Sequence, residues 1–99
     1  MNPFNINKQK DVQLLEKAAI FKCIGDPNCL KILSVLVEEN GPCVSDITKK
    51  VDISISAVSH QLSKLKSMGI VETKRTGQNI CYSLGEGENA QFVKKILEN

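Results

Sequence analysis

The sequence predicts a mainly α-helical fold that carries a β-hairpin wing, which is the winged helix-turn-helix architecture with five helices. Three observations support this prediction. Helical periodicity covers most of the chain, two helical segments within residues 44–68 are joined by a short turn, and two β-rich runs within residues 70–84 flank a glycine. Because the chain has 99 residues and shows no repeats, we expect a single domain over residues 1–99.

The first two helices are delimited by residues that start and stop helices. Gly25 ends the apolar periodicity of a first helix, which is expected at about residues 8–24. Apolar residues cover more of this helix than one core face requires, which indicates two neighbours. Asp26 is placed to cap a second helix that starts at Pro27 and runs to about Glu38, since proline is tolerated in a first helical turn.

The helix-turn-helix is expected from a short third helix, at about residues 44–50, and a fourth helix that begins after Ser54. The fourth helix has two different faces when its residues are placed at intervals of about 100°. The face expected to pack on the core carries Ile55, Val58, Leu62 and Leu65. The opposite face carries Ser56, Ala57, His60, Ser63, Lys64 and Ser67.

The opposite face of this fourth helix suits a nucleic acid. Its side chains are mostly short and polar, so the backbone can approach base edges closely. Ordinary surface helices mix acidic and basic residues, whereas no acidic residue occurs between Ser54 and Val71. Residues 49–75 hold six basic residues against two acidic ones in a chain of net charge +2, which favours a polyanionic partner.

The wing is expected from β-rich runs at residues 70–75 and 79–84, separated by Thr76-Gly77-Gln78. Lys74 and Arg75 lie beside its tip, where they can hold phosphates or reach the minor groove. Strand alternation places Ile80, Tyr82 and Leu84 on the expected core face and leaves Cys81 and Ser83 on the other face.

A last helix is expected at about residues 88–98, and it is too short to be stable unless its apolar stripe is buried. Together with the strongly apolar first helix, it provides surfaces that can pair across a two-fold axis. The predicted homodimer interface consists of Leu14, Leu15, Ala18, Phe92, Val93, Ile96 and Leu97.

No apolar run approaches the roughly 18 residues of a membrane span, and residues 1–10 show no signal segment. We therefore expect a cytoplasmic protein without a membrane partner. In that compartment, the four cysteines are expected to be reduced thiols and not a disulfide framework.

The four cysteines have different expected roles. Cys23 is expected to be a small buried core residue, because it ends an apolar helix. Cys29 and Cys43 fall at or beside helix starts, where the helix dipole favours a reactive thiolate, and Cys81 is a third sensor candidate. Such thiols can bind a thiophilic metal or metalloid ion, or oxidise to a disulfide or polysulfide link, and the sequence does not choose between these. No cofactor is certain.

Four segments together resemble the ArsR/SmtB family of bacterial repressors over about residues 15–84. Residues 21–33 read Phe-Lys-Cys-Ile-Gly-Asp-Pro-Asn-Cys-Leu-Lys-Ile-Leu, residues 43–47 read Cys-Val-Ser-Asp-Ile, and residues 82–84 read Tyr-Ser-Leu, with residues 54–71 as the fourth segment. The resemblance implies a winged-helix homodimer, built on its first and last helices, that binds a palindromic operator and is released by an inducer.

The resemblance also implies positions for DNA contacts. Ser56, Ala57, Ser59, His60 and Gln61 match groove-facing positions of the family's reading helix, and Lys64 matches a phosphate contact. The helical-wheel argument independently places Ser56, Ala57, His60 and Lys64 on the free face. The whole predicted DNA face consists of Ser54, Ser56, Ala57, Ser59, His60, Gln61, Lys64, Lys74 and Arg75.

The sensor motifs of metal-binding relatives are incomplete in this chain. Those relatives open the third helix with Cys-Val-Cys and an aspartate, whereas this chain has Cys43-Val44-Ser45-Asp46 and lacks one sulfur ligand. Glu86 and Glu88 occupy the places of the first ligand pair of a zinc site between terminal helices, and the second pair is missing. The resemblance therefore does not imply zinc sensing through that site.

The sequence predicts a sequence-specific DNA-binding repressor, released from an inverted-repeat operator by an effector that is sensed through cysteine thiols. An enzyme is not expected, because no nucleophile with its base and no Cys-x-x-Cys pair is visible. Two alternatives stay open: a thiol-redox or metal-handling protein without a DNA role, and a winged helix that docks on other proteins.

Overall fold

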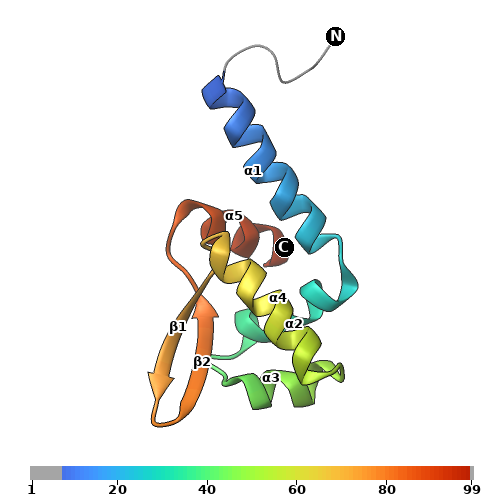
Figure 1. The fold of residues 1–99 in the computed structure, drawn as a ribbon, viewed down its shortest axis with the longest axis vertical. Helices are drawn as coiled ribbons and strands as arrows, with labels where there is room; N and C mark the ends of the chain where they lie inside the picture. The colour runs from blue at the N-terminus through green and yellow to red at the C-terminus, as the bar shows by residue number, and fades with distance from the viewer. Residues whose placement is uncertain (1–7, 99) are drawn as a thin grey trace.

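The computed structural model describes residues 8–98, and within them it contains five helices and one antiparallel hairpin (Figure 1). The winged helix-turn-helix fold predicted from the sequence is confirmed. The elements are α1 (Lys8–Ile24), α2 (Pro27–Glu38), α3 (Val44–Val51), α4 (Ile55–Ser67), β1 (Val71–Thr76), β2 (Asn79–Leu84) and α5 (Glu88–Leu97).

Side-chain caps and one left-handed residue fix ends of α2, α3 and α4. Asp26 Oδ1 accepts a hydrogen bond of 2.9 Å from the backbone N of Asn28, at the start of α2. Ser54 Oγ accepts one of 3.1 Å from the backbone N of Ala57, at the start of α4. Asp52 ends α3 in the left-handed region with φ 54°, which turns the chain toward α4 within a few residues.

A single core joins all five helices to the base of the hairpin. Ile32, Leu33, Ile47, Leu62 and Leu65 are fully buried in it, and they come from α2, α3 and α4. The buried face of α4 packs into this core and against α3 and β1, which leaves its other face free. The start of α5 is tied to the end of α4, because Asn89 Nδ2 donates a hydrogen bond of 3.0 Å to the carbonyl oxygen of Met68.

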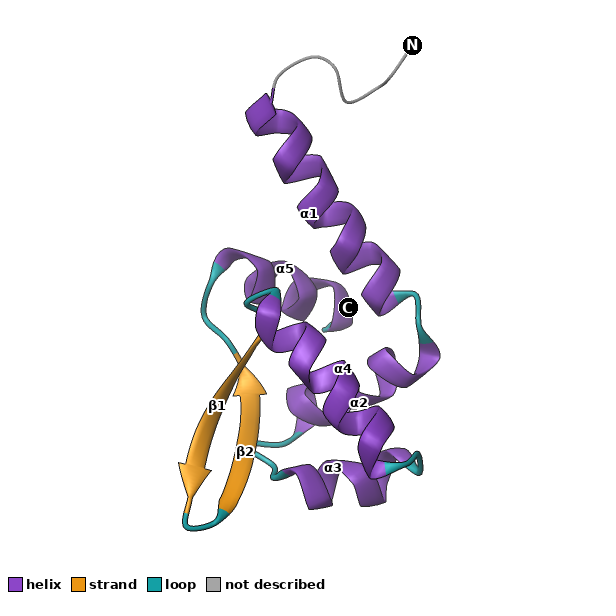
Figure 2. Cartoon of the chain, viewed as in Figure 1, coloured by secondary structure: helices purple, strands orange, loops and turns teal. Residues whose placement is uncertain are grey.

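The first helix, α1, contributes Ile20 and Cys23 to this core as buried residues, and Ile24 packs against it. Its earlier turns extend away from the body of the molecule (Figure 2). Phe21 packs edge to face on Phe92 of α5, with ring centroids 5.6 Å apart. The large exposed apolar residues of these two helices are Val12, Leu14, Leu15, Phe21 and Ile96. In a single chain, α1 and α5 thus leave apolar surface without a covering element.

The hairpin pairs in register from Val71 opposite Leu84 to Thr76 opposite Asn79, so its turn has only two residues. Gly77 is in the first turn position with φ 64°, a backbone conformation that residues with a Cβ rarely adopt. The segment before α3 lies along β2, because the backbone N of Tyr82 donates a hydrogen bond of 2.9 Å to the carbonyl oxygen of Pro42. This contact fixes the wing to the helix-turn-helix.

Three sequence-based expectations about burial are wrong. Ile55, expected in the core, is 59% exposed, because a residue in the first position of a helix points back past the helix start and no other element covers it there. Ile80 is exposed beside the turn, whereas Cys81 is buried against the segment before α3. Val93, expected in a dimer interface, is fully buried in the core of its own chain.

Candidate nucleic-acid interface and cysteine pairs

The free face of α4 is the candidate reading surface. Ser56, Ser59, His60 and Lys64 are exposed, and Ala57 is half-buried. The opposite side of the helix is held by Val58, Leu62 and Leu65, each fully buried. Ser54 is exposed at the helix start, but its hydroxyl oxygen already accepts the capping hydrogen bond from Ala57. The exposed side chains are thus presented by a helix that cannot rotate without losing its core contacts.

Gln61, expected to face a groove, instead holds α4 in place. Its Nε2 donates a hydrogen bond of 3.0 Å to Oδ2 of Asp26, the residue that caps α2 with its other oxygen. Its Oε1 is buried and has no hydrogen-bond partner among residues 8–98. One carboxylate therefore positions both helices, and the amide of Gln61 is not directed at bases. The sequence indicates the capping role of Asp26 but gives no sign of its contact with Gln61.

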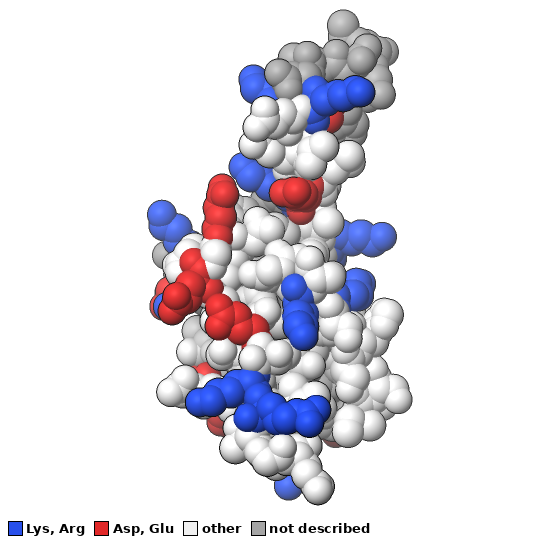
Figure 3. Space-filling model, turned by 60° about the vertical axis from the view of Figure 1, so that its left-hand side comes forward, with Lys and Arg blue, Asp and Glu red and all other residues white. Residues whose placement is uncertain are grey.

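The wing presents Lys74 and Arg75 beside its tip, and both side chains are exposed. Figure 3 shows basic side chains gathered low on the molecule, apart from acidic side chains that gather above them. In the hairpin register, Lys74 is opposite Cys81 and Arg75 is opposite Ile80. Since successive residues of a strand point to opposite faces, Lys74 and Arg75 leave the strand on different sides.

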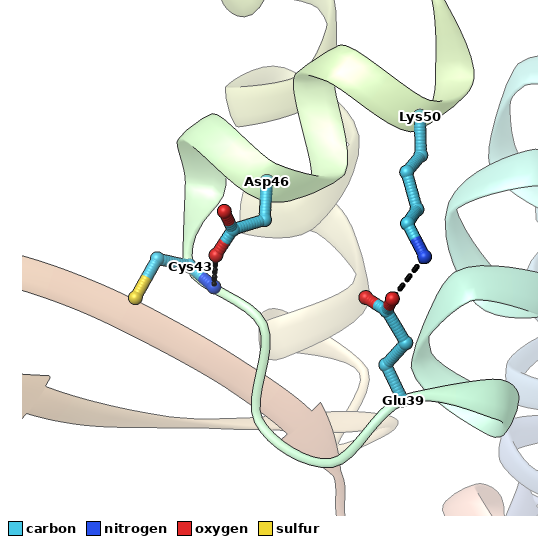
Figure 4. Close-up of polar contacts among 4 residues, drawn as sticks. All are labelled: Glu39, Cys43, Asp46 and Lys50. Carbon is cyan, nitrogen blue, oxygen red and sulfur yellow. Dashed lines mark hydrogen bonds and ion pairs between the residues drawn. The ribbon is translucent and has the colours of Figure 1, made fainter.

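One of the basic residues near the helix-turn-helix is paired within the chain. Lys50 of α3 forms an ion pair with Glu39, which follows α2 (Figure 4). The hydrogen bond that Lys50 donates to the Glu39 carboxylate raises the pKa of the exposed Lys50 ammonium. This pair links the end of α2 to α3, so part of the positive charge counted in residues 49–75 is balanced locally.

The structure joins Cys43 and Cys81 by a disulfide, which corrects the expectation that all four cysteines are free thiols. Cys43 is the N-cap of α3, and its backbone N donates a hydrogen bond of 3.2 Å to Asp46 (Figure 4). Cys81 lies in β2, and the two residues form an isolated antiparallel bridge. Two of the three predicted sensor cysteines are therefore in direct contact, at the junction of α3 and the wing.

The other two cysteines meet inside the core. Their sulfur atoms are 2.8 Å apart, and Cys23 and Cys29 are both buried, between the end of α1 and the first turn of α2. Burial, with further contributions from Cys23, raises the pKa of the Cys29 thiol far above its usual range. This is the opposite of the lowered pKa expected from its place at a helix start, because loss of solvent outweighs the helix dipole. The pairing of Cys23 with Cys29 was not predicted from the sequence.

Residues 8–98 were also searched for a metal site and for a membrane-spanning helix. Within residues 8–98, no three histidine, cysteine or acidic side chains are grouped closely enough to hold a metal ion. Over the same residues, none of the helices combines the length and the apolar character that crossing a membrane requires.

Known proteins share this sequence and this fold. A family described as "Bacterial regulatory protein, arsR family" matches residues 26–73. The chain is 32% identical over 87 residues to the transcriptional repressor SmtB homolog of Synechocystis sp., covering 88% of this chain and 65% of that protein. It is 38% identical over 79 residues to the cadmium resistance transcriptional regulatory protein CadC of Listeria innocua, covering 80% of this chain and 59% of that protein. The chain thus spans 59–65% of the length of these two curated relatives.

Among solved structures, the crystal structure of NolR from Sinorhizobium fredii is similar over nearly the whole chain. It matches with a TM-score of 0.77 and 31% identity, and the match covers 99% of this chain and 95% of that one. The fold defines a winged helix-turn-helix protein. The chain belongs to the ArsR family of bacterial regulatory proteins, as its sequence motifs predict.

Proposed function

We propose that this chain is a sequence-specific DNA-binding repressor that acts as a homodimer on an inverted-repeat operator. The observation that carries the proposal is the free face of α4, which is exposed, polar and without acidic residues, on a helix held rigidly by its buried side. Small polar side chains and one imidazole can hydrogen-bond base edges in a major groove. Lys64, Lys74 and Arg75 then contact phosphates on either side.

The homodimer is supported by the apolar surface that α1 and α5 leave uncovered. Leu14, Leu15 and Ala18 of α1 are exposed, as is Ile96 of α5, while Phe92 and Leu97 are half-buried. A second copy related by a two-fold axis covers the same surface on both chains. Two reading helices about 34 Å apart then enter successive major grooves, which requires an inverted repeat in the DNA.

The effector is proposed to act through cysteine chemistry at Cys43 and Cys81. These two residues connect the start of the helix-turn-helix to the wing, so a change in their bonding acts on both DNA-contacting elements. Cys29, the third candidate, is less suited to be the reacting thiol, because burial raises its pKa. The regulators named for SmtB and cadmium resistance support an effector-controlled repressor in general terms.

The test is a fluorescence-anisotropy titration of the reduced protein against DNA from the promoter of its own gene. His60→Ala and Lys64→Ala are expected to weaken binding, with a loss of about one unit in the salt slope for Lys64→Ala. Lys17→Ala, which removes an exposed charge from α1, is the matched control. If the His60 and Lys64 variants both bind like the parent protein, the proposed reading face is wrong.

A further inference from the structure

A cavity of about 290 Å³ lies where the wing meets the loop between α2 and α3. Its wall includes Asn40 and Gly41 from the loop, and Lys74, Thr76 and Cys81 from the hairpin. It therefore places a cysteine, a hydroxyl and an ammonium group around one space that is large enough for a small oxidant. Cys81 reaches this cavity, while its disulfide partner Cys43 is not part of the wall.

The surroundings of the two sulfur atoms differ in charge. Lys74 is the direct cross-strand partner of Cys81, and such pairs place their Cβ atoms about 4.5–5.5 Å apart on one face of a hairpin. Thr76 Oγ1 lies 3.9 Å from Cys81 Sγ. Cys43 has the carboxylate of Asp46 on its own backbone N, at 3.2 Å. A nearby ammonium group favours a thiolate. Because Cys81 lines the cavity and Cys43 does not, an oxidant held in the cavity meets Cys81 first.

We propose that Cys81 is the thiol that reacts with a hydroperoxide bound in this cavity, and that Cys43 then closes the disulfide. Lys74 and Thr76 act as positioning residues, which favour the Cys81 thiolate and hold the peroxide beside it. This inference rests on the thiol-sensing part of the proposed function and gives it an oxidant class, a site and an order of reaction.

The reaction proceeds in two balanced steps. The Cys81 thiolate attacks one oxygen of the hydroperoxide, the O–O bond breaks, and Cys81 becomes a sulfenic acid while the other oxygen leaves as hydroxide or alkoxide. The Cys43 thiol then attacks the Cys81 sulfur, the S–O bond breaks, and the oxygen leaves as water once protonated. Two thiols are oxidised to one disulfide, and the peroxide is reduced to water, or to an alcohol and water.

Backbone contacts, as well as the disulfide, hold the two residues next to each other. The hydrogen bond from Tyr82 N to Pro42 O holds the two segments in an antiparallel bridge that does not depend on sulfur. The Cα atoms of Cys43 and Cys81 are 3.8 Å apart in the bonded form. Closure covalently joins β2 to the start of α3, so it restricts movement of the wing relative to the helix-turn-helix.

The order of reaction is tested by trapping the sulfenic acid with dimedone after hydrogen peroxide is added to the reduced protein. In Cys43→Ser, Cys81 cannot be resolved, so mass spectrometry is expected to find the adduct on Cys81. In Cys81→Ser, Cys43 is expected to stay largely unlabelled. The assignment would be overturned if the Cys81→Ser variant carried the adduct on Cys43 while the Cys43→Ser variant carried none on Cys81. It would also be overturned if the parent protein formed neither an adduct nor a disulfide.

The role of the cavity is tested without changing a cysteine. Lys74→Met is expected to slow disulfide closure by about threefold to tenfold, since a rise of up to one unit in a thiol's pKa lowers its thiolate fraction by up to about tenfold. Arg75→Met removes the neighbouring charge on the other face of the strand and is expected to close at the parent rate. Equal rates for both variants would remove Lys74 from the mechanism. Far-UV circular dichroism of each reduced variant checks that it is folded.

Operator titration of the reduced parent protein separates this inference from the proposed function. If the protein binds its operator tightly and in a salt-sensitive way but peroxide does not oxidise Cys81, the inference is rejected and the proposed repressor function stands. If the disulfide forms as expected but the protein does not bind DNA, the proposed repressor function is rejected. The disulfide then has no role in regulating DNA binding.

Discussion

Cys43 and Cys81 join the start of α3 to the wing beside a cavity, whereas Cys23 and Cys29 meet inside the core between α1 and α2. Both are pairs of closely placed sulfur atoms in the same small protein. The first pair lies among charged and polar groups, including Lys74, Thr76 and Asp46. In the second, Cys29 is fully buried and Cys23 nearly so, and burial raises the pKa of Cys29. We therefore expect environment, more than proximity, to decide which of these thiols react.

The largest expected difference between the pairs is in reaction rate. In the reduced, native protein, Cys43 and Cys81 are expected to react with iodoacetamide on the order of a hundredfold faster than Cys23 and Cys29. Cys29 is fully buried, so reagent reaches it only when the fold opens locally, and Cys23 is nearly as buried. Time-resolved alkylation followed by peptide mass spectrometry measures all four rates in one experiment. Comparable alkylation rates for the two pairs would show that their environments do not make them differ in reactivity.

The second expected difference is in DNA binding. Peroxide treatment is expected to weaken operator binding by about 5- to 150-fold, because the disulfide acts on both the wing and the helix-turn-helix. Cys43→Ser is expected to abolish this response, while Cys23→Ala is expected to keep it. Anisotropy titrations of oxidised and reduced protein at one salt concentration measure the effect. A response that persists in Cys43→Ser would move the sensor elsewhere in the chain.

The order and type of the elements could be predicted because each has a local signal, such as Asp26 before Pro27, or Ser54 before the apolar stripe of α4. What the sequence could not indicate depends on contacts between distant segments. Cys43 and Cys81 are 38 residues apart, and they meet only because the segment before α3 runs along β2. The hydrogen bond of Gln61 to Asp26 spans 35 residues, and it removes a side chain that the family resemblance had assigned to the reading face.

Helical periodicity also fails to predict burial where a helix extends past its neighbours. Ile55 has the right angular position for the core and is nevertheless exposed, because burial also requires a neighbouring element at that height along the helix. Val93 shows the converse case: its place on the apolar stripe of α5 suited a dimer contact as well as a core contact, and a neighbouring element of the same chain buries it. For the candidate site, the exposed part of α4 could therefore be predicted, whereas the arrangement of the cysteines could not.

The third expected difference is in stability under reducing conditions. Cys29→Ser places a hydroxyl in the apolar core, which is expected to lower the free energy of unfolding by about 1–3 kcal/mol. Cys43→Ser replaces the N-cap of α3 by a residue preferred there, so stability is expected to stay the same or rise by up to about 1 kcal/mol. Urea denaturation with a reductant present measures both. Equal losses in the two variants would show that the two environments do not differ in polarity as described.

The smallest expected difference is in the response to alkaline pH. Because the pKa of Cys29 is raised in the folded chain above its ordinary value of 9.0, the folded state keeps the thiol neutral where the unfolded state ionises. Stability from this group is therefore fully present below about pH 9 and is lost as the pH rises further, by at most about 1.4 kcal/mol per pH unit. In reduced protein, Cys29→Ala is expected to flatten this decline between about pH 9 and pH 10.5, and Cys43→Ala is expected to leave it unchanged. Urea denaturation at several pH values measures this decline. If the free energy of unfolding falls as steeply in Cys29→Ala as in the parent protein, ionisation of the core thiol does not contribute to the decline.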